Sequence, residues 1–294
     1  MNQMKEIKNP KSYGRPFAIG IALNVGFVVV EILFGLLANS SALLADAGHN
    51  ASDVLGLAFA WTAAWLSTIK PKGKYTYGLR KTTILVSILN ALLLFAAVAA
   101  IGWDAIDKLK SPQPVAGAQV ILVAGIGVVI NTATALLFIK GQKHDLNIRG
   151  AFLHMAADAA VSLGVVLAGL LIIWTGHYWI DPVMSFIIIA VILYGTIRLF
   201  SDSVNLALDA VPKNIDLEDV KRFIENRDGV ESLHDLHIWA MSTTQVALTA
   251  HLVMPRGSND LFIKKLNQDL ERMFNIGHTT FQIENQNLEN LEDC

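Results

Sequence analysis

Six long apolar segments constrain the fold of this chain more than any other feature of its sequence. Each is roughly 20 residues long, the length that a helix needs to cross a hydrocarbon core of about 30 Å. A backbone inside a membrane must satisfy its own hydrogen bonds, which favours helices over irregular structure. The sequence therefore predicts an α-helical membrane domain at residues 16–210, with six transmembrane helices near Pro16–Leu37, Ala42–Ser67, Thr82–Trp103, Val115–Ile139, Ala151–Trp174 and Pro182–Phe200.

The composition agrees with a membrane protein and excludes several other classes. The chain is 53% hydrophobic and only 16% charged, with a mean hydropathy of +0.46, which is too apolar for a soluble protein of this size. Its net charge of −2 gives nucleic-acid binding no electrostatic basis. The single cysteine, Cys294, rules out an internal disulfide. The polar segment 1–15 lacks the features of a cleaved signal peptide.

The lysine and arginine residues predict the orientation in the membrane. Basic residues precede the first apolar segment, and they also follow the second, fourth and sixth segments. The opposite side is poor in them, with Lys108 and Lys110 as the exception. Because cytoplasmic loops carry the excess of positive charge, we expect both termini, including the segment 1–15, to be cytoplasmic. The residues on which this prediction depends are Lys5, Lys8, Lys11, Arg15, Lys70, Lys72, Lys74, Arg80, Lys81, Lys140, Lys143, Arg149 and Arg198.

The last part of the chain, residues 211–294, changes character and predicts a small cytoplasmic domain. Amphipathic and alternating patterns indicate the order helix, strand, strand, helix, strand. Such an αββαβ order in roughly 80 residues is typical of an α+β fold with helices on one face of a sheet. The segments are Asp216–Asn226, Gly229–Ala240, Thr244–Met254, Asp260–Phe274 and His278–Glu284.

Two of the apolar segments contain ionisable residues where only apolar groups are expected. His49 and Asp53 lie one helical turn apart in the second segment, and His154 and Asp158 repeat that spacing in the fifth. Each such residue at bilayer depth costs about 2.5–3.5 kcal/mol on insertion scales. At 1.5 Å per residue, Asp53 lies roughly 16 Å from the outer end of its segment and Asp158 roughly 11 Å from the inner end of its own. Both pairs therefore fall in the middle of the membrane, where they can meet.

Two imidazoles and two carboxylates are the number and mix of ligands that Zn²⁺ takes in tetrahedral sites. Mg²⁺ and Ca²⁺ prefer more oxygen ligands, while Co²⁺, Fe²⁺, Mn²⁺ and Ni²⁺ agree with this ligand set. Protons compete with the metal for the same groups. A site that opens to each side in turn would then exchange metal for protons. The alternative is that each pair only holds helices together through hydrogen bonds.

Other polar residues have more than one interpretation. Asp46 lies one turn outward from His49 on the same face, and Glu31 lies in the first apolar segment. We interpret Asp46 as a pathway residue or as a residue that supports the ligands without binding the metal. Glu31 is interpreted as a packing hydrogen bond between helices, or as a pathway residue or proton carrier. In the cytoplasmic domain, four histidines and one glutamate are candidate metal ligands, but sequence spacing alone does not make them converge. They are His234, His237, His251, His278 and Glu284.

These motifs together resemble the cation diffusion facilitator family, in particular its zinc-efflux branch. The resemblance covers nearly the whole chain. It is carried by Ser41-Ala-Leu-Leu-Ala-Asp-Ala-Gly-His-Asn-Ala-Ser-Asp53, Tyr77-Gly-Leu-Arg-Lys81, His154-Met-Ala-Ala-Asp158, His234-Asp-Leu-His-Ile-Trp239 and His278-Thr-Thr-Phe-Gln-Ile-Glu284.

The resemblance implies a homodimeric exporter of zinc with a ferredoxin-like cytoplasmic domain at the dimer contact. It implies that His49, Asp53, His154 and Asp158 are the transport ligands. It also implies a cytoplasmic metal at His234, His251 and Glu284, with His278 as a possible addition, and a charge interlock between Lys81 and Asp209. The short loops and the lack of a signal peptide favour a bacterial inner membrane.

Two other functions agree with a zinc site in the membrane. An intramembrane metalloenzyme would need an open coordination position and a general base, but four protein ligands leave no vacancy and the sequence has no His-Glu-x-x-His motif. A zinc sensor would bind the metal and signal through the cytoplasmic domain without moving the metal. A flux measurement separates the sensor from a transporter.

Overall fold

The computed structural model describes residues 14–67, 69, 71–138 and 146–286 of the 294-residue chain. These residues fall into two compact units. One combines the described residues up to Leu57 with Leu92–Ile197, and the other combines those of Ala58–Ala91 with those from Arg198 onward. Most of the predicted segment 1–15 lies outside the described residues, as do Lys70, Lys140, Lys143 and Cys294. The predicted domain limits at residues 15–16 and 210–211 stay a prediction.

Six long helices form at the six apolar segments. Three of them extend well beyond a predicted end: α3 continues to Lys110, α5 begins at Leu146, and α6 continues to Ala207. The apolar pattern underestimates these helices because polar residues continue the backbone hydrogen bonding past the apolar stretch. The bounds are α1 Gly14–Leu37, α2 Ser41–Ser67, α3 Thr82–Lys110, α4 Gly117–Phe138, α5 Leu146–Thr175 and α6 Ile180–Ala207.

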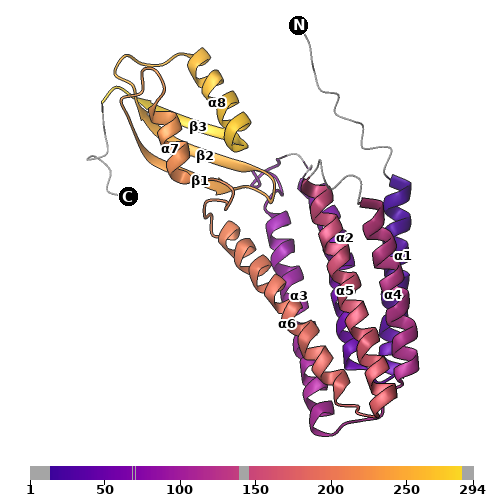
Figure 1. Cartoon of the computed structure of the whole chain (residues 1–294). Helices are drawn as coiled ribbons and strands as arrows, with labels where there is room; N and C mark the ends of the chain where they lie inside the picture. Colours follow the sequence, from indigo (N-terminus) through magenta and orange to yellow (C-terminus); the bar gives the residue numbers. More distant parts are fainter. Residues whose placement is uncertain (1–13, 68, 70, 139–145, 287–294) are drawn as a thin grey trace. The chain divides into compact units, whose positions relative to one another are not determined.

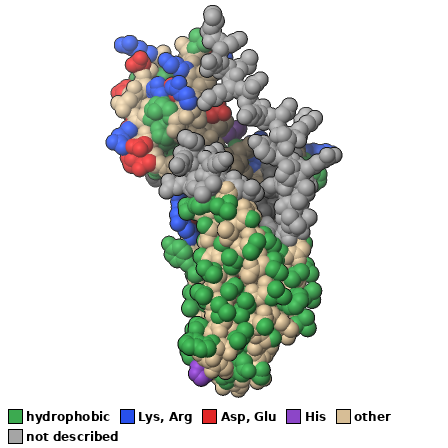
Figure 2. All heavy atoms as spheres, turned by 45° about the vertical axis from the view of Figure 1, so that its right-hand side comes forward, with side chains coloured by type: hydrophobic (Ala, Val, Ile, Leu, Met, Phe, Trp, Pro, Cys, Tyr) green, Lys and Arg blue, Asp and Glu red, His purple; other side chains and the backbone are tan. Residues whose placement is uncertain are grey.

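Four of these helices are long and apolar enough, over their described residues, to cross a membrane. They are Thr82–Lys110, Gly117–Leu136, Phe152–Thr175 and Ile180–Ala207. In α1, the apolar stretch with described side chains is shorter and runs from Val25 to Leu37. Figure 2 shows hydrophobic side chains over most of the visible helical surface, as a lipid-facing surface requires. A membrane domain of six spans remains a prediction.

Helices α4 and α5 approach each other closely because both carry glycine at their contact. A Cβ atom on Gly117 would lie 3.1 Å from the Gly169 carbonyl oxygen, and one on Gly169 would lie 3.3 Å from the Gly117 carbonyl oxygen. Small residues at such contacts let helix backbones pack tightly within a membrane. The close contact fixes α5, which carries His154 and Asp158, against its neighbour.

Asp181, in the first turn of α6, binds the beginning of α2. It lies inside α6, one residue after the first residue of that helix, Ile180. Its carboxylate accepts hydrogen bonds from the backbone N–H groups of Ser41 at 2.6 Å and Ala42 at 3.4 Å, and from the Ser40 hydroxyl. A buried carboxylate at these N–H groups satisfies donors that have no partner within the helix. Asp181 therefore anchors the helix that carries His49 and Asp53.

Replacing Asp181 by alanine is expected to destabilise the protein by about 2–3 kcal/mol, since hydrogen bonds to a charged group contribute about 1.5–3 kcal/mol. Asp181 is only 1% exposed, so water cannot substitute for it. Thermal unfolding in detergent measures the change. The matched control is Asp107→Ala, an exposed acid on α3, for which we expect less than about 0.5 kcal/mol. Equal unfolding temperatures for the two variants would contradict the anchoring role.

The C-terminal part of the second unit has the predicted αββαβ order. It consists of α7 (Leu217–Glu225), β1 (Ser232–Ala240), β2 (Val246–Val253), α8 (Asp260–Phe274) and β3 (Ile276–Glu284). The strand order is β1-β2-β3, with β1 and β2 antiparallel and β2 and β3 parallel. Helices α7 and α8 both pack against this sheet (Figure 1). They also contact each other through Phe223 and Phe274, whose ring centroids are 5.2 Å apart.

Local signals explain where these helices begin and end. The Asp216 side chain accepts hydrogen bonds from the N–H groups of Glu218 and Asp219 and so caps α7. Asn259 caps the beginning of α8, and Asn275 ends it in a left-handed conformation with φ of 58°. The apolar faces of both helices meet the inward side chains of the sheet in one core, which includes Val220, Ile224, Leu248, Leu252, Leu266 and Leu270.

Candidate functional site

Two helices of the first unit bring the four predicted transport ligands together. His49 and Asp53 lie one turn apart on α2, and His154 and Asp158 lie one turn apart on α5. Both pairs therefore project from one face of their helix. The side chains meet across the contact between α2 and α5, as the spacing predicts.

The histidine and carboxylate atoms of this cluster lie within direct contact of one another. His49 Nε2 is 3.1 Å from Asp158 Oδ1, and His154 Nε2 is 3.2 Å from Asp53 Oδ2 and 3.7 Å from Asp158 Oδ2. The ring centroids of the two histidines are 6.2 Å apart. Ligand atoms of His49, Asp53 and Asp158 all lie within 4.8 Å of one another. His154 contacts both of these carboxylates. Nitrogen and carboxylate oxygen at such spacing can hold one divalent cation.

The exposure of these side chains differs within each helix, which supplies one more buried and one more exposed member of the cluster. Asp158 is 2% exposed and His49 19%, whereas Asp53 is 34% and His154 45% exposed. The cluster is thus buried on the side of His49 and Asp158 and accessible on the side of Asp53 and His154. Two carboxylates also neutralise a divalent cation, which lowers the cost of holding it among apolar helices.

Glu31 and Asp46, the two predicted pathway residues, are both completely buried. Asn50 Nδ2 donates a hydrogen bond to Glu31 Oε2 at 2.8 Å, and Ser162 Oγ donates one to Asp46 Oδ2 at 2.9 Å. Asn50 and Ser162 were not predicted as partners of these acids. Asn50 lies one turn after Asp46 and Ser162 one turn after Asp158, but helical spacing does not show which side chains of neighbouring helices meet.

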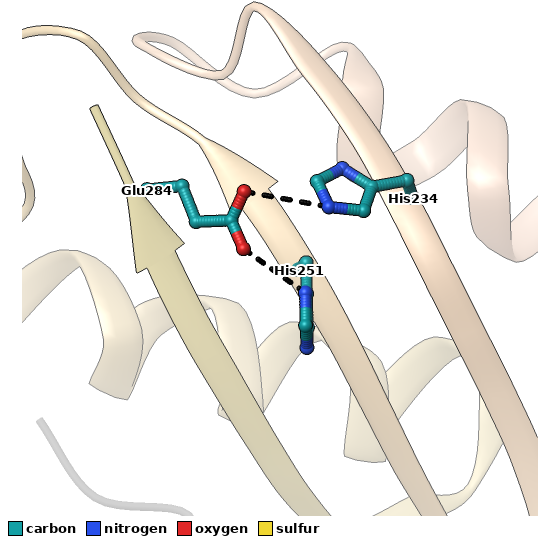
Figure 3. Close-up of side chains that lie close together, drawn as sticks. All are labelled: His234, His251 and Glu284. Carbon is teal, nitrogen blue, oxygen red and sulfur yellow. Dashed lines mark ion pairs between the residues drawn. The ribbon is translucent and has the colours of Figure 1, made fainter. Parts of the chain in front are cut away.

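A second cluster of metal-binding side chains lies on the sheet of the second unit (Figure 3). His234 Nε2 is 3.3 Å from Glu284 Oε2, and His251 Nδ1 is 3.0 Å from Glu284 Oε1. Ligand atoms of the three residues lie within 4.8 Å of one another. His234 Nδ1 is buried and has no hydrogen-bond partner among the described residues. Two imidazoles and one carboxylate fit a metal ion such as Zn²⁺, and the His234 imidazole has a nitrogen without a partner among the described residues.

The strand register creates this second cluster. His234 of β1 pairs directly with His251 of β2, so their side chains share one face of the sheet. His251 also pairs with Gln282 of β3, and Glu284, two residues further on, lies on that same face. A β-bulge between His234 and His237 places Asp235 at a φ of 50°.

Asp235 is a neighbour of this cluster that the sequence did not predict. Its carboxylate is 2.7 Å from His237 Nε2 and 3.4 Å from His251 Nε2. The signal was present, because Asp235 stands between the two histidines of the His234-Asp-Leu-His237 motif. The bulge turns its side chain toward His251, and a bulge cannot be read from the motif alone.

His278 does not join the second cluster in the described structure. It lies near the beginning of β3, whereas Glu284 is the last residue of that strand. The separation is roughly 20 Å at 3.3 Å per residue. Instead, the His278 ring packs edge-on against Tyr77, with centroids 5.7 Å apart.

Lys81 and Asp209 form the predicted interlock within the second unit. Lys81 Nζ and Asp209 Oδ1 are 2.7 Å apart, and both side chains are about half exposed.

Two protein-family models match this chain, one over each of its two successive parts. A family model described as "Cation efflux transmembrane domain" matches residues 17–206, and one described as "Cation efflux protein, cytoplasmic domain" matches residues 212–286. The chain belongs to the cation efflux family. The resemblance to cation diffusion facilitators is thereby confirmed, and the family is one of membrane transporters.

Several bacterial relatives cover most of this cation efflux protein. The "Cadmium, cobalt and zinc/H(+)-K(+) antiporter" of Bacillus subtilis is 34% identical and covers 91% of this chain and 88% of its own. The zinc transporter ZitB of Escherichia coli is also 34% identical, covering 92% of this chain and 86% of its own. A solved structure, the "Metal-bound C-terminal domain of the CzcD transporter from Cuprividus metallidurans", is 39% identical, covers 24% of this chain and 99% of its own, and has a TM-score of 0.21.

Proposed function

We propose that this protein exports Zn²⁺ across a bacterial inner membrane in exchange for protons, through six transmembrane helices with both termini in the cytoplasm. The observation that carries the proposal is the meeting of His49, Asp53, His154 and Asp158 between α2 and α5. Four such ligands match the tetrahedral preference of Zn²⁺. The names of the relatives, which include zinc transporters and an antiporter, support the same substrate.

Exchange with protons follows from the chemistry of the ligands. Metal binding requires neutral imidazoles and ionised carboxylates, so protons and the metal exclude each other at these groups. A cation entering from one side displaces protons, and protons entering from the other side displace the cation. Alternating access around one fixed site turns this competition into antiport.

We also propose that the protein is a homodimer that binds a metal at His234, His251 and Glu284 in its cytoplasmic domain. When bound, this metal would join all three strands of the sheet, since each strand supplies one of the three residues. The dimer rests on the family resemblance and on the match to the cytoplasmic-domain model. Size-exclusion chromatography with light scattering tests the dimer.

A flux experiment tests the transport function. The full chain is reconstituted in liposomes with a zinc-sensitive dye and, separately, a pH-sensitive dye inside. An interior-acid pH gradient should drive zinc uptake, and zinc entry should alkalinise the interior. Zinc binding without flux would support a sensor instead. Zinc-dependent hydrolysis of an added substrate without flux would support a metalloenzyme.

A further inference from the structure

Glu31 is a buried carboxyl group that the four metal ligands do not explain. It is 0% exposed on α1. Asn50 Nδ2 donates a hydrogen bond to Glu31 Oε2, but Glu31 Oε1 has no hydrogen-bond partner among the described residues. A charged carboxylate with one partner is unfavourable in an apolar interior. A neutral carboxylic acid, with its proton on Oε1, fits these surroundings better.

The groups around Glu31 reinforce this interpretation. Asp46 is a second acid on the same face of α2, one helical turn before Asn50, the residue that contacts Glu31. Asp46 is also completely buried, and its Oδ1 has no partner among the described residues. The other helix that packs against α1 is α4, and its sequence from Gly117 to Phe138 contains no ionisable residue. Neither α2 nor α4 contains a lysine or arginine that could pair with a charged Glu31.

The second acid connects Glu31 to the metal cluster electrostatically. Asp46 lies one helical turn before His49 on α2, and its hydrogen-bond partner Ser162 lies one turn after Asp158 on α5. Two neighbouring buried carboxyl groups do not both ionise readily. A divalent cation held by the four ligands attracts negative charge on both acids, so it favours loss of the proton. Departure of the cation reverses this preference.

We propose that Glu31 binds one of the protons exchanged for the metal, at a position separate from the metal ligands. This inference rests on the proposed antiport. When the cation binds, the O–H bond at Glu31 breaks and the proton leaves to water. When the cation leaves, Glu31 takes up a proton again. Asn50 holds the carboxyl group in place through the other oxygen.

Proton counting in detergent tests the proposal. The full chain carries Glu284→Gln in every sample, including the one that serves as wild type, so that the cytoplasmic cluster contributes little binding. It is titrated with zinc in weak buffer with a pH dye, and the protons released per bound zinc are measured. Glu31→Gln keeps the shape and can still accept the Asn50 hydrogen bond, but it cannot release a proton. We expect it to bind zinc and to release about one proton fewer per zinc than the wild type. An unchanged proton count would overturn the proposal.

Two further variants separate proton binding from a merely structural role. Glu31→Asp retains an acid and should restore the wild-type proton count. Asp107→Asn removes an exposed acid on α3 and should also release the wild-type number of protons. A Glu31→Asp variant that does not restore the count would assign the loss in Glu31→Gln to altered helix packing.

An infrared measurement covers the case in which Glu31→Gln does not fold. In the wild type, zinc addition should remove the carbonyl band of a protonated carboxyl group, and its persistence would count against the proposal. In Glu31→Asp, the shorter acid should shift that band.

The outcomes also distinguish failure of the proposed antiport from failure of the proposed role of Glu31. A wild type that moves no zinc refutes antiport itself, whereas normal antiport with an unaltered proton count in Glu31→Gln refutes only the role of Glu31.

Discussion

Alanine in place of Asp158 is expected to lower zinc transport by at least about 100-fold, because even groups that only orient metal ligands contribute 10–100-fold to metal affinity. Asp158 is the most buried of the four candidate ligands, at 2% exposed. Its two oxygens face two different histidines, with Oδ1 3.1 Å from His49 and Oδ2 3.7 Å from His154. Its removal takes away one ligand, one of two negative charges, and the partner of both imidazoles.

Zinc uptake into proteoliposomes driven by a pH gradient measures this loss, with the amount of folded protein checked by gel filtration. The matched control is Asp107→Ala, which removes an exposed acid from α3 and should transport like the wild type. Asp158→Asn distinguishes charge from shape. It keeps the side-chain volume and should still lose transport. An uncharged amide neither offsets the charge of the cation nor takes up and releases protons near neutral pH. Transport at the wild-type level in Asp158→Ala would remove Asp158 from the ligand set.

Replacement of Glu284 by glutamine is expected to weaken metal binding by the cytoplasmic cluster by at least about 100-fold. The Glu284 side chain is 3% exposed and contacts His234 through one oxygen and His251 through the other. Glutamine offers a single neutral oxygen in its place, so the bound cation would lose its only carboxylate in this group of three. The two histidines would remain as a weaker pair.

The measurement is made in an Asp158→Ala background, so that the intramembrane cluster contributes little binding. Isothermal titration with zinc then reports the cytoplasmic cluster. Glu271→Gln, an exposed acid on α8, serves as the control. Zinc should raise the unfolding temperature of the background protein, since a ligand that binds only the folded state stabilises it, and this rise should disappear in Glu284→Gln. Equal zinc affinity with and without Glu284 would contradict the proposed cytoplasmic site.

The predicted elements agree with the structure where a local pattern defined them. Helix α8 has the predicted bounds, Asp260–Phe274, because its apolar repeat and its N-cap Asn259 coincide. The apolar segments located all six long helices but not the ends of α3, α5 and α6. The predicted convergence of α2 and α5 matches the structure, because the repeated His-x-x-x-Asp spacing fixes which face of each helix is polar.

The polar partners of the buried acids could not be predicted from the sequence. Asp181 binds the first turn of α2, which lies 140 residues earlier in the chain. Asn50 and Ser162 gave no signal that they would meet Glu31 and Asp46. Such pairs depend on the rotation and depth of one helix against another, and apolar periodicity constrains these only to a broad face.

The cytoplasmic cluster distinguishes most clearly between what can be read from the sequence and what requires the folded chain. The residue types and the αββαβ order are properties of the sequence, because local periodicity and capping decide where strands and helices form. The sequence does not decide which of His234, His251, His278 and Glu284 meet. That depends on the antiparallel pairing of His234 with His251 and the parallel pairing that brings Glu284 alongside. Strand register is set by the packed core and by a β-bulge, so only the tertiary structure includes Glu284 and leaves out His278.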